Sequence, residues 1–177
     1  MSFTLPDRYL KRISDIDIQK DLINAGYKFV LLDVDNTILT RDESVVPDDV
    51  QKWLAKARKA GLKFCLVSND WHKNVVELAN EIKLPIVVKS LKPLPAAFYR
   101  ARKKIGANKQ NCIMIGDQLM TDVFGAHVVG LKCILVQPLV EKDLIHTLML
   151  RKIEKVFLRN IEPENRKAGS KVEKTKN

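Results

Sequence analysis

The residues of this chain that could take part in catalysis follow four short apolar runs. In chain order they are Asp33, Asp35 and Thr37, then Ser68 and Asn69, then Lys89 and Lys92, and then Asp117 and Asp122. If the apolar runs are parallel β-strands, these side chains meet at one edge of a sheet, where parallel α/β sheets bind their ligands. One such residue alone is weak evidence, but the ordered set predicts a single site.

Carboxylates combined with a hydroxyl, an amide and a lysine suit the transfer of a phosphoryl group. Phosphate esters are anionic, so a carboxylate nucleophile needs a cation such as Mg²⁺, which prefers oxygen ligands of the kind Asp33 and Asp117 offer. A lysine with a serine or asparagine can hold the phosphoryl oxygens. Asp33 and Asp35 share one face if the strand continues through them. One could then attack phosphorus while the other protonates the leaving oxygen and later activates water.

The elements that must position these residues alternate between strand and helix. Apolar runs predict strands, at residues 29–32, 62–67, 86–88, 112–115 and 131–136. Apolar periodicity with Pro at the start and Gly past the end predicts helices, at about 47–60, 71–82, 95–105 and 120–129. This alternation predicts an α/β fold, a Rossmann-like parallel five-stranded sheet with helices on both faces. Residues 1–27 are expected to form a loop and one helix, at about 16–25.

Four motifs in order resemble those of the haloacid dehalogenase superfamily of phosphatases. They are DVDNT at 33–37, Val67-Ser68-Asn69, Lys92-Pro93, and GDQLMTD at 116–122, and together they span about residues 28–136. The chain is most similar to the YqeG-like subfamily, which is related to the phosphatidylglycerophosphate phosphatases. That similarity extends to residues 5–37 and to DLIHTLMLRKIEK at 143–155.

The resemblance implies a role for each motif residue. Asp33 would be the nucleophile that forms an aspartyl-phosphate, and Asp35 the general acid and base, with its backbone carbonyl on Mg²⁺. The phosphate-binding residues would be Thr37, which also supports the loop, Ser68, Asn69 and Lys92. The metal residues would be Asp33, Asp35, Asp117 and Asp122, the last bound to the metal directly or through another ligand. Lys89 stays open as an alternative to Lys92.

The spacing of the motifs leaves no room for a cap domain. Asp35 and Ser68 are 33 positions apart and Ser68 and Lys92 are 24 apart, and the predicted helices and strands use most of both gaps. The resemblance therefore implies a capless member with an open site. An open site suits a phosphate presented on a large body, such as a lipid headgroup, a protein or a polynucleotide. It suits a free metabolite less well unless a homo-oligomer closes the site.

The composition favours an anionic partner in a reducing compartment. Lys and Arg number 31 against 21 Asp and Glu, a net charge of +10. Three cysteines without a CxxC pair argue against disulfides and zinc sites, so we expect buried thiols. No apolar run reaches the length of about 20 residues that spans a bilayer, and charged residues interrupt the N-terminus, so we expect a cytoplasmic protein. With 6% aromatic residues and no RNA-binding or zinc motif, sequence-specific nucleic-acid recognition is not supported.

Residues 1–160 are expected to form a single phosphatase domain that ends in a basic amphipathic helix at about 141–160. This helix could pack on the core, on a partner, or on an anionic membrane at its inner face. Residues 161–177 are expected to be a polar, basic, disordered tail.

The leading hypothesis is a Mg²⁺-dependent phosphomonoester hydrolase acting on phosphatidylglycerophosphate or another phospholipid headgroup. Alternatives are a phosphatase of phosphoproteins or nucleic-acid ends, and an RNA- or protein-binding module with a slow phosphatase site. A third is a phospho-accepting switch, but Asp35 argues against it because a second aspartate hastens hydrolysis.

Overall fold

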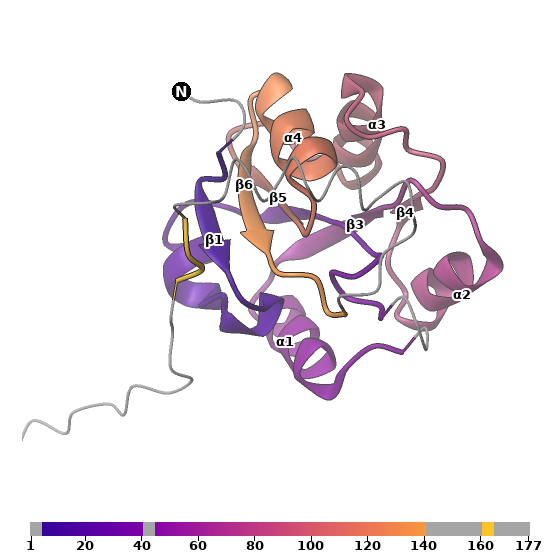
Figure 1. The fold of residues 1–177 in the computed structure, drawn as a ribbon, viewed down its shortest axis with the longest axis horizontal. Coiled ribbons are helices and arrows are strands. Elements are labelled where there is room, and N and C mark those ends of the chain that lie inside the picture. The colour runs from indigo at the N-terminus through magenta and orange to yellow at the C-terminus, as the bar shows by residue number, and fades with distance from the viewer. Residues whose placement is uncertain (1–4, 41–44, 141–160, 165–177) are drawn as a thin grey trace, which may run out of the picture.

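The strands form one parallel sheet in the computed structural model, which describes residues 5–40, 45–140 and 161–164 (Figure 1). Within these residues the sheet has six strands in the order β1-β6-β5-β2-β3-β4. They are β1 (Arg8–Leu10), β2 (Phe29–Leu32), β3 (Lys63–Val67), β4 (Ile86–Val87), β5 (Cys112–Gly116) and β6 (Lys132–Val136). The α-helices are α1 (Asp48–Lys59), α2 (Lys73–Glu81), α3 (Pro95–Ile105) and α4 (Phe124–Val128). A 3-10 turn, η1 (Ile13–Asp15), and two π-helical segments, η2 (Ile18–Ile23) and η3 (Leu119–Val123), complete the order.

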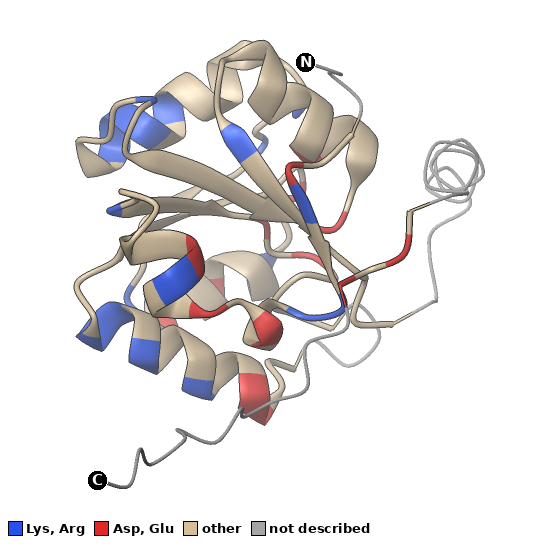
Figure 2. Ribbon diagram, turned by 90° about the vertical axis from the view of Figure 1, so that its left-hand side faces the viewer, with Lys and Arg blue, Asp and Glu red and all other residues tan. Residues whose placement is uncertain are grey.

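Each face of the sheet buries its own apolar cluster under a layer of helices (Figure 2). Val30 and Leu32 belong to the cluster that includes residues of α1 and α2, whereas Leu31 between them belongs to the cluster of α3 and α4. Successive side chains of a strand point to opposite faces, so a strand covered on both faces must be apolar throughout. The predicted fold class, with helices on both faces of a parallel sheet, is therefore confirmed.

The predicted count of five strands is corrected to six, because residues 8–10 form β1. This segment pairs with β6 in parallel, with Arg8 opposite Ile134 and Leu10 opposite Val136. Only Leu10 of the three residues is fully buried. A three-residue edge strand with one buried side chain has no apolar run, so its sequence does not reveal it.

Two predicted helices also differ in form. The helix expected at about 16–25 is the π-helical η2, at whose start Asp17 accepts a hydrogen bond from the Lys20 amide at 2.9 Å. The helix expected at about 120–129 is η3 followed by α4. The helix expected at 95–105 has those bounds, because Pro95 occupies its first turn and Gly106 ends it with φ 70°.

Residues 161–164, the start of the expected disordered tail, lie against β1. The Glu164 amide donates to the Tyr9 carbonyl at 2.8 Å, and the Glu164 carboxylate pairs with Arg8. The helix expected at 141–160 and the rest of the tail lie outside the described residues. No helix among those described has the length and apolar character needed to cross a membrane. The prediction of free, buried cysteines is confirmed for Cys65, Cys112 and Cys133.

Candidate active site

Four charged side chains that follow three different strands meet in a buried cluster. Asp33 follows β2, Lys92 follows β4, Asp117 follows β5 and Asp122 lies in η3. They are exposed by only 6%, 5%, 2% and 1%, respectively. Oxygen atoms of the three aspartates all lie within 4.8 Å of one another, an arrangement that could hold a metal ion. The carboxyl ends of parallel strands thus bring three carboxylates and one lysine together, as the sequence predicts.

Lys92 is the cation of this cluster. Its Nζ donates to Asp122 Oδ1 at 2.7 Å and also contacts Asp33 Oδ1. Burial disfavours the ammonium ion, but the carboxylates of Asp122 and Asp33 outweigh that effect and raise the pKa of Lys92. Burial, reinforced by the charge of Asp33, raises the pKa of Asp122 to about 6, although Lys92 opposes the shift. The cluster therefore holds more negative charge than one lysine neutralises.

Asp33 is held through both of its carboxylate oxygens. Oδ1 faces Lys92, and Oδ2 accepts a hydrogen bond from Thr37 Oγ1 at 3.1 Å. The same hydroxyl lies 3.5 Å from Asp117 Oδ1. Thr37 reaches back because the chain turns at Asn36, whose φ is 63°, a left-handed conformation that asparagine tolerates better than most residues. The predicted supporting role of Thr37 has a geometric basis in these contacts.

Asp35 lies in a different environment from Asp33. It is half-buried, and its Oδ2 accepts a hydrogen bond from Ser68 Oγ at 2.8 Å. Strand β2 ends at Leu32 and the chain then turns, so the two-residue period of a strand does not extend to this pair. Ser68 also accepts from the Asp70 amide at 2.9 Å, which fixes the hydroxyl that holds Asp35. Ser68 therefore contacts the second aspartate here, and its predicted contact with phosphate stays a prediction.

Asn69 braces the loop that carries Lys92. Its Oδ1 accepts from the Lys92 amide at 2.7 Å and from Ser90 Oγ at 2.6 Å, and its Nδ2 donates to the Lys92 carbonyl at 3.0 Å. The predicted contact of Asn69 with phosphate stays a prediction. Lys89, the alternative phosphate lysine, lies with its Nζ 4.2 Å from the centroid of the Trp71 ring. The structure thus brings Lys92, and not Lys89, to Asp33.

Sequence reasoning missed two residues that shape the site. A Cβ atom on Gly116 would lie 2.3 Å from Asp122 Oδ2, so the close approach of Asp122 to the end of β5 requires glycine there. The buried Ser90 donates the hydrogen bond that helps to orient Asn69. The glycine of GDQLMTD was a signal for the first, whereas nothing in the sequence around Ser90 indicates its role.

The amino-acid sequence is similar to those of known hydrolases. The sequence pattern of the haloacid dehalogenase-like hydrolases matches residues 8–130. The chain is 33% identical over 156 residues to the "Probable phosphatase YqeG" of Bacillus subtilis (strain 168), which covers 88% of this chain and 90% of that protein.

Solved structures agree in fold. A HAD phosphatase from Thermococcus onnurineus aligns with a TM-score of 0.55 at 18% identity, over 73% of this chain and 97% of that one. The cobalt-bound deoxy-D-mannose-octulosonate 8-phosphate phosphatase of Haemophilus influenzae aligns with a TM-score of 0.50 at 12% identity, over 76% and 89%. At these identities the likeness shows the shared fold alone.

Proposed function

The chain belongs to the haloacid dehalogenase-like hydrolases and is a phosphatase of that family, and we propose that it hydrolyses phosphomonoesters with Mg²⁺ through an aspartyl-phosphate on Asp33. The observation that carries this proposal is the buried contact of Asp33 with Lys92 beside two further carboxylates. A carboxylate in that position can attack phosphorus while an ammonium group a few ångströms away binds the phosphoryl oxygens.

The residues present suit Mg²⁺. Three buried carboxylates lie around the one lysine described in the cluster, so its net charge is negative when all four groups are ionised. Carboxylate oxygens are also the hard donors that Mg²⁺ prefers. Asp33 and Asp117 would bind the ion, with the Asp35 carbonyl. Asp122 already accepts from Lys92 and from the Gln118 amide, so it would support the site from behind these ligands. The bound ion would offset the charge of the phosphoryl oxygens and fix their orientation.

The side chains divide the reaction between them. An Asp33 oxygen forms a bond to phosphorus as the bond from phosphorus to the leaving oxygen breaks, and Asp35 gives its proton to that oxygen. Asp35 then takes a proton from water, the water oxygen bonds to phosphorus, and the Asp33 carboxylate leaves. Lys92 stays protonated throughout, because its carboxylate neighbours raise its pKa. Ser68 holds Asp35 in reach through its hydroxyl.

We propose the phosphate of a phospholipid headgroup, with phosphatidylglycerophosphate as the first candidate, as the substrate. Support comes from the short connections between the strands, whose described residues form no cap, and from the net charge of +10. The similarity to the YqeG-like subfamily points the same way. A protein that acts on such a substrate would be cytoplasmic and would meet the membrane at its inner face.

Phosphate release from a panel of phosphomonoesters tests this function. The panel holds phosphatidylglycerophosphate in mixed micelles, a phosphopeptide, a 5′-phosphorylated oligonucleotide and a small aryl phosphate. Each is assayed with Mg²⁺ and with EDTA. We expect Asp33→Asn to abolish release, because the amide is a poor nucleophile, and EDTA to stop it reversibly. Asp17→Asn is the matched control, since asparagine caps a helix as well as aspartate does. Release by Asp33→Asn would contradict the mechanism, and preferential release from the peptide or oligonucleotide would contradict the lipid substrate.

A further inference from the structure

Three large apolar side chains are exposed on the two loops that frame the site. Trp71 is exposed by 60%, Leu91 by 64% and Leu94 by 54%, and we call these three residues the apolar rim. Trp71 lies in the loop after β3, close behind Ser68, whereas Leu91 and Leu94 lie on either side of Lys92 in the chain. Exposed apolar groups that cluster beside a catalytic centre mark a surface that contacts something else.

The two loops are tied to each other, so the apolar rim has a fixed position relative to the catalytic lysine. The Ser90 amide donates to the Ser68 carbonyl at 3.1 Å and the Lys89 amide to the Asp70 carbonyl at 3.4 Å. Asn69 adds its hydrogen bonds to both backbone groups of Lys92. A ligand that contacts the rim therefore meets a surface in register with the active site.

The backbone of the loop that carries Leu91 adopts a conformation of unfavourable free energy. Leu91 has φ 59° and Lys89 has φ 46°, both in the left-handed region that residues with a Cβ atom avoid. A leucine that is exposed by 64% does not recover that cost through packing within the chain. Strain of this kind clusters at functional sites, and here it occurs in the loop that carries Lys92.

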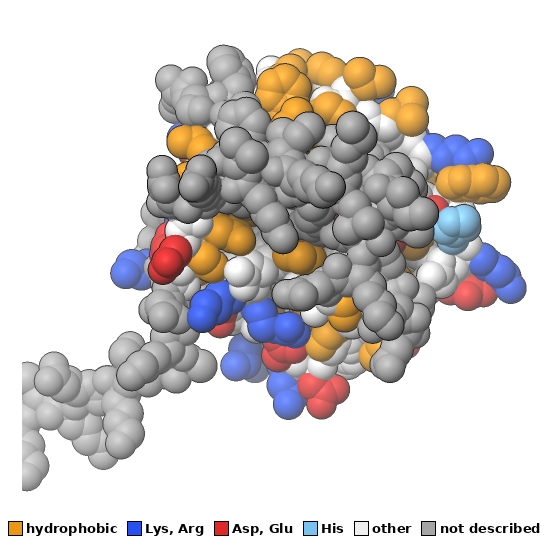
Figure 3. Space-filling model, in the orientation of Figure 1, with side chains coloured by type: hydrophobic (Ala, Val, Ile, Leu, Met, Phe, Trp, Pro, Cys, Tyr) orange, Lys and Arg blue, Asp and Glu red, His pale blue; other side chains and the backbone are white. Residues whose placement is uncertain are grey.

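Basic and aromatic groups accompany the apolar rim. Lys89 Nζ lies over the Trp71 ring, and the His72 ring stacks beside Trp71 with a centroid distance of 6.2 Å and an interplanar angle of 16°. Figure 3 shows hydrophobic, histidine and basic side chains side by side at the right-hand margin of the molecule. Tryptophan and lysine with exposed leucines are the residues that favour the boundary between lipid and water. Next along the chain, Lys73 pairs with Glu77, whereas Lys89 forms no ion pair with any residue that the structure describes.

We propose that the apolar rim, with Lys89, inserts into an anionic lipid surface and so presents a headgroup phosphate to Asp33. This deepens the proposed function and rests on its phospholipid substrate. A stable protein interface needs about 800 Å² from each partner, more than three partly exposed side chains offer, whereas a lipid surface needs only a few apolar anchors and a cation.

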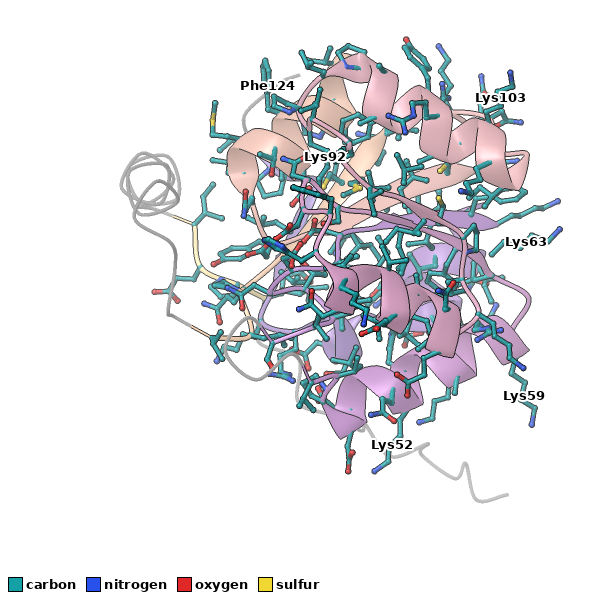
Figure 4. All side chains as sticks on the ribbon, turned by 90° about the vertical axis from the view of Figure 1, so that its right-hand side faces the viewer. Lys52, Lys59, Lys63, Lys92, Lys103 and Phe124 are labelled. Atoms are coloured by element: carbon teal, nitrogen blue, oxygen red, sulfur yellow. The ribbon has the colours of Figure 1, made fainter. Side chains whose placement is uncertain are left out.

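Among the described residues, the lysines near the amino ends of the strands do not suit this role. Figure 4 shows Lys92 directed into the molecule, whereas Lys59, Lys63 and Lys103 extend from the right-hand margin, away from Lys92. Lys59 and Lys103 lie near the ends of α1 and α3, which precede the amino ends of strands. A membrane bound to that side would face the edge of the sheet opposite the active site, so it could not deliver a headgroup to Asp33.

Tryptophan fluorescence provides the test, because the chain has only two tryptophans. Trp53 is buried and donates to the Ile16 carbonyl at 2.9 Å, while Trp71 is exposed. The full chain carrying Asp33→Asn is mixed with vesicles of phosphatidylcholine with or without phosphatidylglycerol, in which the acyl chains carry bromine as a quencher. Because this variant does not turn over in the proposed mechanism, binding is measured apart from catalysis. We expect quenching and a blue shift of emission with the anionic vesicles, and neither in a Trp71→Phe variant.

Vesicle sedimentation of further variants separates the rim from general charge. Leu91→Asn removes an apolar anchor while suiting the left-handed backbone, and we expect roughly a tenfold loss of binding. Lys89→Gln should lose about fivefold and reduce the salt dependence. Val128→Asn is the matched control. Val128 is exposed by 44% at the end of α4, at the amino side of the sheet, and its replacement should leave binding unchanged.

The outcomes distinguish this inference from the proposed function. Absence of quenching by anionic vesicles, or equal binding by Leu91→Asn and Val128→Asn, would refute the insertion of the apolar rim into lipid, whichever substrate the enzyme hydrolyses. Quenching of Trp71 by a 5′-phosphorylated oligonucleotide or a phosphopeptide, but not by vesicles, would refute a lipid surface as the partner of the apolar rim. Vesicle quenching by a protein whose wild type releases no phosphate from any substrate would support the rim and contradict the proposed function.

Discussion

Substitution of Gly116 by alanine tests whether catalysis depends on the position of Asp122. A Cβ atom at residue 116 would lie 2.3 Å from Asp122 Oδ2, 2.4 Å from its Cγ and 2.8 Å from its Cβ. An ordinary contact between such atoms is about 3.5 Å, so the two groups must separate by about 1 Å. Asp122 cannot yield freely, because Lys92 and the Gln118 amide both donate to its carboxylate.

The size of the effect follows from that displacement. A shift of about 1 Å in a group that positions catalytic residues costs about 100-fold in rate, and overpacking a buried site costs about 1–3 kcal/mol of stability. We therefore expect Gly116→Ala to lower kcat/KM by about 100-fold while the protein stays folded. The loss should appear in kcat more than in KM, because Lys92 and Asp33 are moved relative to the reacting phosphorus.

The assay is steady-state release of phosphate from a small aryl phosphate, with stability measured in parallel by urea unfolding. Gly26→Ala is the control: its φ of 88° also penalises alanine, but nothing lies within 4 Å and the residue precedes β2 at the opposite end of the sheet. In an Asp122→Ala background Gly116→Ala should cost far less, since two of the three nearest atoms are gone. A kcat/KM within about twofold of wild type in folded Gly116→Ala would refute the reasoning.

Substitutions and chemical modification of other buried and charged groups should have measurable effects. Lys92→Met leaves buried carboxylates without their cation, so we expect a loss of about 3 kcal/mol in the free energy of unfolding, partly restored by Mg²⁺; an unchanged urea midpoint would contradict it. Arg12 donates to Asp49 at 2.8 and 2.9 Å and lowers the pKa of that carboxyl from 3.8 to about 2. The stabilisation by the ionised carboxylate is present above pH 4 and is lost as the pH falls through 2. Asp49→Asn should therefore lower the free energy of unfolding at neutral pH by at most about 1 kcal/mol, because the carboxylate is partly exposed. In acid-unfolding curves this difference from the wild type should vanish near pH 2. Burial raises the pKa of the Cys65 and Cys112 thiols to about 12 and that of the Cys133 thiol well above 9. An aromatic disulfide reagent at pH 8 should therefore modify none of the three cysteines in the native protein and all of them in urea.

Local physical chemistry made most of the fold predictable from the sequence. Helix α3 has the predicted bounds because its start and stop signals, Pro95 and Gly106 respectively, act within a turn of the chain. The other five strands were predictable because each lies in a continuous apolar run, as burial between two layers of helices requires. β1 was missed because its pairing with β6, about 125 positions away, is what makes residues 8–10 a strand.

The composition of the candidate site was likewise readable from the sequence, because parallel strands carry whatever follows them to one edge. Asp33, Asp117, Asp122 and Lys92 meet for that reason. Which lysine enters the cluster depends on contacts between loops: Asn69 holds Lys92 inward, while Lys89 lies over Trp71. The Lys92-Pro93 motif favours Lys92 by resemblance, but spacing alone does not distinguish the two lysines.

The class of fold and the set of reactive groups are therefore readable from the amino-acid sequence, because both depend on local periodicity and on the direction of the strands. How those groups divide their contacts depends on the folded arrangement. It placed Asp33 against Lys92 and Asp35 against Ser68, although a continued strand would have set the two aspartates on one face. The folded arrangement also explains why residue 116 is glycine: Asp122 reaches the end of β5 when η3 packs against that strand, and it leaves no room there for a Cβ atom. Such choices depend on packing between segments far apart in the chain, which side-chain type and spacing do not encode.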